Sequence, residues 1–83
     1  MRTMDAVRRS GVGIGPERSV RDAAAIMEQA GVGSLAVIDG AHLVGIVTDR
    51  DLVRRALAPG LAPDVRVDAV MILFAHRDSV VRA

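Results

Sequence analysis

The sequence predicts a small α/β domain of the α+β type, with the order strand, helix, strand, strand, helix. Two amphipathic runs, each opened by a hydroxyl residue with an acidic residue three positions later, predict the two helices. Two β-branched apolar runs separated by a glycine-containing turn predict a hairpin between them. A chain of 83 residues has room for one domain at most.

Composition narrows the classes of function. The sequence has no cysteine, which excludes disulfides, thiolate metal sites and cysteine nucleophiles. Its only aromatic residue is Phe74, so the core must be aliphatic. No apolar run approaches the roughly 20 residues of a membrane helix, and no apolar signal stretch follows the N-terminal charges. We therefore expect a cytoplasmic protein with no membrane partner.

The first helix is predicted to begin after Ser19, with Asp22 completing its cap, and to end at Gly31. A short strand over 12–14 precedes it. Helical spacing predicts a buried face made of Val20, Ala23, Ala24, Met27 and Ala30.

The second half of the unit is predicted as a hairpin followed by a helix. Residues 35–38 and 43–47 form the strands, and 39–42 form the turn. Thr48 then caps a helix over 49–58, which the prolines and glycine that follow bring to an end. Its predicted buried stripe consists of Leu52, Val53, Ala56 and Leu57.

The tail of the chain repeats its head. The triplet Asp-Ala-Val occurs at 5–7 and again at 68–70, and residues 19–23 resemble residues 79–83. Two matches in the same order, at an interval of about 60 residues, indicate a repeated unit. We expect one complete unit over 1–58, then a linker and the truncated start of a second unit over 59–83.

Residues 45–51 place a strand end, a hydroxyl and a carboxylate around the start of a helix. Backbone N–H groups at such a start favour a phosphate or another anion. Thr48 could donate to a phosphate or ribose oxygen, and Asp51 could accept from ribose hydroxyls, as acidic residues do at other nucleotide sites. Alternatively, Thr48 and Asp51 only cap the helix. The residues alone leave both interpretations open.

Residues 45–51 resemble the Gly–apolar–apolar–Thr/Ser–x–x–Asp signature of CBS domains, which are named after cystathionine β-synthase. The resemblance extends through 19–23, 31–39 and 43–45, and departs at Ala36, where the family usually has proline. It implies a β-α-β-β-α unit with a small mixed three-stranded sheet and two helices on one face. It also implies a regulatory module that binds an adenosine nucleotide between paired units, and not an enzyme.

The resemblance implies a role for each matching residue. Thr48 and Asp51 match the hydroxyl facing the phosphate or ribose and the carboxylate that binds the ribose. Ile46 matches an apolar residue near the base, Val32 and Gly33 match the lining of the adenine pocket, and Ser10 and Val12 match the segment that closes it. The implied ligands are AMP, ADP, ATP or S-adenosylmethionine, with no required cofactor.

We expect two copies of the chain to pair, because most of the second unit is missing. In the family two units pack sheet against sheet, so a single unit is expected to leave Val37 and Ile46 partly uncovered. An exposed apolar patch of this kind marks an association surface. We expect a homodimer through the sheet and helix face, with residues 71–74 docked on the same core or swapped between chains.

Other features point to no further chemistry. No nucleophile–base pair can be drawn, so no residue is predicted to be catalytic. His42 is expected on the surface, and no set of metal ligands is evident. The Arg pairs at 8–9 and 54–55 lack stacking aromatics, so no nucleic-acid partner is expected, although Arg50 and Arg54 could neutralise a ligand phosphate. The alternatives are an interaction module without a ligand and a truncated remnant of a tandem protein.

Overall fold

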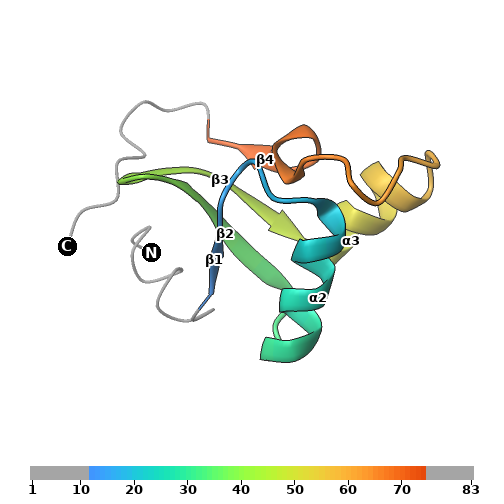
Figure 1. Ribbon diagram of the computed structural model, residues 1–83, viewed down its shortest axis with the longest axis horizontal. Coiled ribbons are helices and arrows are strands. Elements are labelled where there is room, and N and C mark those ends of the chain that lie inside the picture. Colours follow the sequence, from blue (N-terminus) through green and yellow to red (C-terminus); the bar gives the residue numbers. More distant parts are fainter. Residues whose placement is uncertain (1–11, 75–83) are drawn as a thin grey trace.

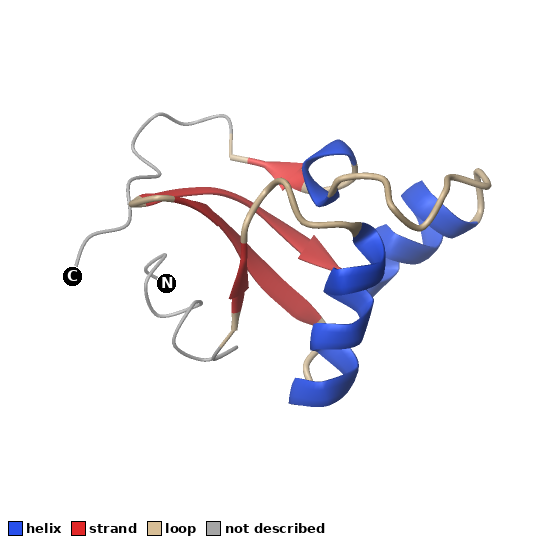
Figure 2. Ribbon diagram, in the orientation of Figure 1, coloured by secondary structure: helices blue, strands red, loops and turns tan. Residues whose placement is uncertain are grey.

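A four-stranded sheet with helices on one side forms the fold of the chain (Figures 1 and 2), and the computed structural model describes residues 12–74. The elements are β1 (Gly13–Ile14), α2 (Val20–Ala30), β2 (Ser34–Asp39), β3 (His42–Thr48), α3 (Asp49–Leu52) and β4 (Ile72–Leu73). A π-helical segment, Val53–Leu57, continues α3, and a 3₁₀ turn, Val67–Ala69, precedes β4. Within residues 12–74 no helix is long and apolar enough to span a membrane.

The sheet has the strand order β1-β2-β3-β4 and is mixed, because β1 runs parallel to β2 while the other two pairs are antiparallel. The three predicted strands are confirmed. The β2–β3 hairpin turns at Gly40, whose φ of 63° is the left-handed conformation that glycine adopts readily. The fourth strand comes from the segment that could either dock or swap, and here it docks on β3 of its own chain.

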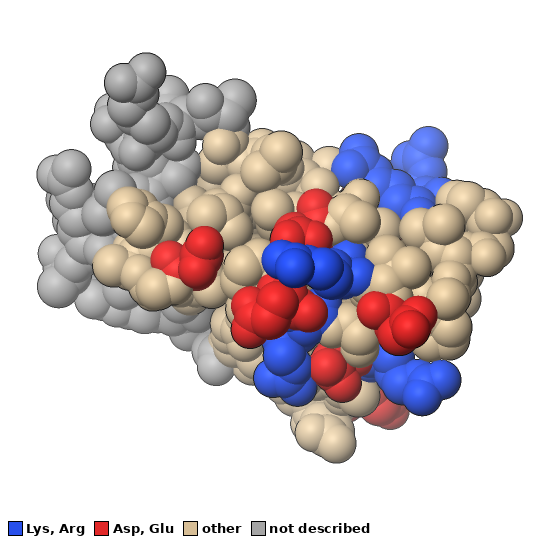
Figure 3. Space-filling view, turned by 45° about the horizontal axis from the view of Figure 1, so that its top comes forward, with Lys and Arg blue, Asp and Glu red and all other residues tan. Residues whose placement is uncertain are grey.

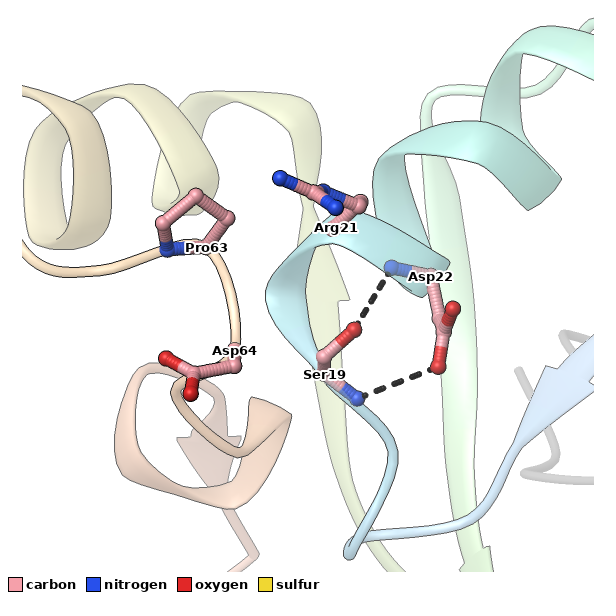
Figure 4. A pocket seen from close by; sticks show the side chains of 5 residues that line it. All are labelled: Ser19, Arg21, Asp22, Pro63 and Asp64. Atoms are coloured by element: carbon pink, nitrogen blue, oxygen red, sulfur yellow. Dashed lines mark hydrogen bonds between the residues drawn. The ribbon is translucent and has the colours of Figure 1, made fainter.

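The predicted ends of α2 are confirmed. Ser19 Oγ accepts a hydrogen bond from Asp22 N–H at 2.9 Å, and Asp22 Oδ2 accepts from Ser19 N–H at 3.5 Å. Figure 4 shows this reciprocal capping box. The Arg18 guanidinium, 3.0 Å from Asp22, lowers the pKa of that exposed carboxyl. Gly31, in the left-handed conformation with φ 68°, ends the helix.

The core lies between the helices and one face of the sheet. Its main members are Val20, Ala23 and Met27 from α2, Leu35, Val37 and Val47 from the sheet, and Leu52 and Ala56 from α3 and its continuation. The buried stripe on each helix is narrower than the sequence predicts. The predictions for Ala24 and Ala30 in α2, and for Val53 and Leu57 after α3, are therefore wrong, because these residues lie on the exposed side of their helices.

The prediction that Val37 is partly uncovered is also wrong. Val37 is fully buried, because it shares with Leu35 the face of β2 that packs against the helices. Ile46 is half-buried, as expected. It pairs with Ala36, and both residues alternate with the core-facing residues, so they lie on the opposite face of the sheet.

The close approach of β4 to β3 depends on Gly45. A Cβ at this position would lie 2.6 Å from the Ile72 carbonyl oxygen and 2.8 Å from Met71 Sδ. Both distances are too short for real Cβ contacts, and the first involves backbone that cannot move without shifting β4. Glycine at 45 is therefore required for β4 to pair where it does.

We expect Gly45→Ala to lower the free energy of unfolding by about 1 kcal/mol, because the added methyl overpacks the β3–β4 contact and the short β4 can move away to relieve it. Urea titration followed by circular dichroism measures this. Gly15→Ala is the matched control, because there the added Cβ meets the flexible carboxylate of Glu17 instead of backbone. Equal stability losses in the two variants would contradict this account of β4.

Candidate functional site

Thr48 and Asp51 form a reciprocal capping box at the start of α3. Asp51 N–H donates to Thr48 Oγ1 at 3.1 Å, and Thr48 N–H donates to Asp51 Oδ2 at 2.9 Å. Asp51 is only 9 % exposed, so this carboxylate needs partners to stay charged. The capping interpretation of these two residues is therefore confirmed by their geometry.

Capping leaves part of each side chain available. Thr48 Oγ1 accepts one hydrogen bond, and its own hydroxyl proton can still be donated. Asp51 Oδ1 accepts no hydrogen bond within residues 12–74, and Arg55 Nε lies 4.0 Å from it. A carboxylate offers about four acceptor positions. The cap and a ligand can therefore use different atoms of the same two residues.

Three further residues lie at the same end of the sheet, where β2 begins and β3 ends. The Gly33 carbonyl accepts from Asp49 N–H at 3.0 Å, which ties the start of β2 to the start of α3. Val32, half-buried, packs beside it on the core. Ile46 lies two residues before Thr48, on the same face of β3. Thr48, Asp51, Ile46, Val32 and Gly33 thus lie toward the same end of the sheet, with Ile46 on the face away from the helices and Val32 packed on the core.

Val12 approaches this region from the other side of β2. Its carbonyl accepts from Ala36 N–H at 3.4 Å, which places Val12 two strands away from Thr48. Two strand spacings are about 10 Å, a span that a nucleoside can bridge. Ser10, the remaining predicted site residue, lies outside the described residues.

Positive charge near the site comes mainly from side chains. The N–H groups of Asp49 and Asp51 are already bonded, so they are not open to a phosphate. Three guanidiniums, those of Arg50, Arg54 and Arg55, line a hollow of about 270 Å³ together with Asp51. On the face drawn in Figure 3, acidic and basic side chains are interspersed.

A larger hollow, of about 510 Å³, lies beside the start of α2 and is a weaker candidate (Figure 4). Its hydroxyl, from Ser19, and its carboxylate at Asp22 are engaged in the exposed capping box. The first amides of α2 are also satisfied, because Val20 N–H donates to Val65 and Arg21 N–H to Pro63. The side chains of Arg21 and Asp64 also line this hollow, and their opposite charges offset one another there.

Arg55 is the residue that sequence reasoning missed. Its side chain faces Asp51 and also donates, through Nη1, to the carbonyls of Val70 and Met71 at 3.4 Å each. The i,i+4 spacing from Asp51 could have indicated the first contact. The second contact joins residues 15 and 16 positions apart, and no local pattern predicts it.

Comparison with known proteins decides the family. A family model described as CBS domain matches residues 5–58. The chain belongs to the CBS domain family. The CBS domain-containing protein YhcV of Bacillus subtilis (strain 168) is 34 % identical over 58 residues, which cover 70 % of this chain and 41 % of YhcV. The chain thus spans less than half the length of this curated relative.

Solved CBS structures share the fold. The crystal structure of a cystathionine β-synthase domain protein fused to a Zn-ribbon-like domain matches with a TM-score of 0.74 at 29 % identity, covering 77 % of this chain and 93 % of that chain. The CBS domain protein PAE2072 from Pyrobaculum aerophilum, complexed with AMP, matches with a TM-score of 0.68 at 22 % identity, covering 75 % and 49 %. At this low identity, the likeness to PAE2072 shows a shared fold.

Within residues 12–74 no group of three or more His, Cys, Asp or Glu side chains could hold a metal ion. His42 begins β3 and is exposed, as expected.

Replacing the cap residue of α3 should reveal how much of its role is structural. Thr48→Ala removes the acceptor for Asp51 N–H, and we expect a loss of about 1 kcal/mol of stability. Thr48→Ser keeps the hydroxyl and should retain most of that energy. Chemical unfolding of both variants checks this, and equal losses in the alanine and serine variants would contradict the capping role.

Proposed function

We propose that the chain is a regulatory CBS module that binds an adenosine-containing small molecule at the end of the sheet where β3 meets α3, and that it has no catalytic activity of its own. The single observation that carries this proposal is the buried Asp51 carboxylate, which has one oxygen in the capping box and the other without a hydrogen bond. A ribose diol supplies two donors that can satisfy such an oxygen.

The remaining contacts follow from the positions of the neighbours. The Thr48 hydroxyl donates to a phosphate or ribose oxygen, and Arg50 supplies a positive charge for the phosphate. Ile46, Val32 and Gly33 offer an apolar and backbone surface for a base, and Val12 approaches from the far side of β2. Ser10 belongs to the proposed site by family resemblance alone. AMP is the first ligand to test, and ADP, ATP and S-adenosylmethionine follow.

Pairing of units completes the proposal. We propose that residues 1–58 form the complete unit and that 59–83 form a linker and the start of a second. An apolar groove of about 230 Å³ runs between α2 and the continuation of α3. Leu57, 71 % exposed, and Leu61, 41 % exposed, line it, and Val53 is 53 % exposed on the same segment. A second copy of the chain that covers these residues would remove apolar surface from water.

Ligand binding is tested by thermal melting. A ligand that binds only the folded chain raises the melting temperature, by about 4–8 °C for each kcal/mol of stabilisation in a domain of this size. We expect AMP, ADP, ATP or S-adenosylmethionine to do so. Asp51→Asn keeps an acceptor for Thr48 N–H but removes the charge, and should weaken binding about 10-fold or more.

The matched control is Asp22→Asn, which makes the same change in the exposed capping box of α2. It should leave the ligand-induced shift unchanged. No shift with any of the four compounds, or equal effects of the two substitutions, would sink the proposed site.

The exposed groove residues favour a second candidate function, in which the unit pairs and binds no small molecule. Leu57→Glu tests the pairing on which both candidates depend. The side chain is exposed in the single chain, so the substitution should cost little stability there. At an interface it buries an unpaired charge, and we expect the dimer to dissociate at tens of micromolar in sedimentation equilibrium.

Gln29→Glu is the control, because it adds one negative charge at an exposed position of α2 with almost no change of shape. It should leave the dimer intact. A monomeric wild-type chain at the same concentration would overturn the pairing. Pairing without any nucleotide effect on melting would select the second candidate.

A further inference from the structure

Arg55 connects two parts of the molecule that are distant in sequence. Its Nε lies 4.0 Å from Asp51 Oδ1, in the proposed ligand site. Its Nη1 donates to the carbonyl oxygens of Val70 and Met71, at 3.4 Å each. One guanidinium, about half exposed, thus contacts both the site and the segment that leads into β4.

The segment that Arg55 holds is firmly packed at one end and weakly held at the other. Val67 and Val70 are fully buried in the core. β4 itself has two residues, and Ile72 and Leu73 remain 43 % and 66 % exposed. An element with so little burial opens at a small free-energy cost. The contacts of Arg55 with Val70 and Met71 lie between the buried part of this segment and the exposed strand β4.

The site touches β4 by a second route. Ile46, a proposed contact for the base, is the direct pairing partner of Ile72. Just beyond, Phe74 N–H donates to the Val44 carbonyl at 3.1 Å. A change in the position of β4 therefore reaches Ile46 through the strand, and reaches Asp51 through Arg55.

We propose that Arg55 is a positioning residue that couples occupancy of the Asp51 site to the docking of β4. The inference rests on the proposed function. Asp51 Oδ1 orients the Arg55 guanidinium, and ligand hydroxyls that donate to Oδ1 compete with Arg55 for its charge. The guanidinium then loses the partner that orients it toward the Val70 and Met71 carbonyls, and β4 opens more often. A ligand can shift this equilibrium only because Oδ1 faces Arg55 when β4 is docked. By linkage, loosening β4 changes ligand affinity by the same factor.

Hydrogen exchange of the full chain, followed by NMR without ligand, tests the coupling directly. Arg55→Gln removes the charge, and we expect the Phe74 amide to exchange about 5-fold faster, the effect of losing one modest hydrogen bond. Arg55→Lys should give a smaller increase. Arg54→Gln is the control, because Arg54 makes no hydrogen bond or ion pair within residues 12–74. Asp51→Asn keeps the cap and should raise exchange at the same amide.

The amides inside α2 distinguish coupling from general stability. They should keep their exchange rates in Arg55→Gln, and a uniform increase across the chain would overturn the inference, as would equal rates at Phe74 in the Arg54 and Arg55 variants. Saturating AMP should accelerate Phe74 exchange in the wild type and add nothing in Arg55→Gln. If AMP binds and wild-type exchange at Phe74 stays unchanged, the inference is wrong. Failure of AMP to bind overturns only the proposed ligand, and the ligand-free variants still decide the coupling.

Discussion

The reciprocal hydrogen bonds between Thr48 and Asp51 are the constraint on which the rest of the site depends. They end β3, begin α3 and fix a nearly buried carboxylate in one orientation. A carboxylate in such a place is stable as an anion only while its oxygens have donors or a nearby cation. Oδ2 of Asp51 is held by the cap, whereas Oδ1 has only the Arg55 guanidinium nearby. Oδ1 can therefore accept a hydrogen bond from a ligand that approaches it.

The chain contains a second box of the same design, and the comparison shows what burial adds. The Ser19–Asp22 box at α2 is less buried, and its carboxylate accepts from Ser19 N–H and from the Arg18 guanidinium at the surface. The Thr48–Asp51 box lies against the core, and its arginine also contacts the backbone of another segment. The same capping pattern therefore gives a simple cap in one place and a connected site in the other, because only the arginine of the second box also binds the backbone of another segment through its side chain.

Local features of the structure could be predicted from the sequence, and features set by distant contacts could not. Ser19, Gly31 and Thr48 act within a few residues, so their capping roles follow from spacing alone. The burial of Val37 and the exposure of Leu57 depend on which face of the sheet meets the helices. For the site, residue types indicated Thr48 and Asp51 but left cap and ligand open. The contacts of Arg55 with Val70 and Met71 required the fold itself.

The predicted repeat relates the position of β4 in the sheet to that of β1. The match of Ser19 with Ser79 sets an offset of 60 residues, which makes Ile72 the counterpart of Val12, just before β1. β1 borders the sheet beside β2, and β4 borders it beside β3. If the predicted repeat holds at this offset, the sheet is flanked on both edges by corresponding segments. If a second unit is built like the first, its opening strand already belongs to the first sheet, and movement of β4 carries that unit with it.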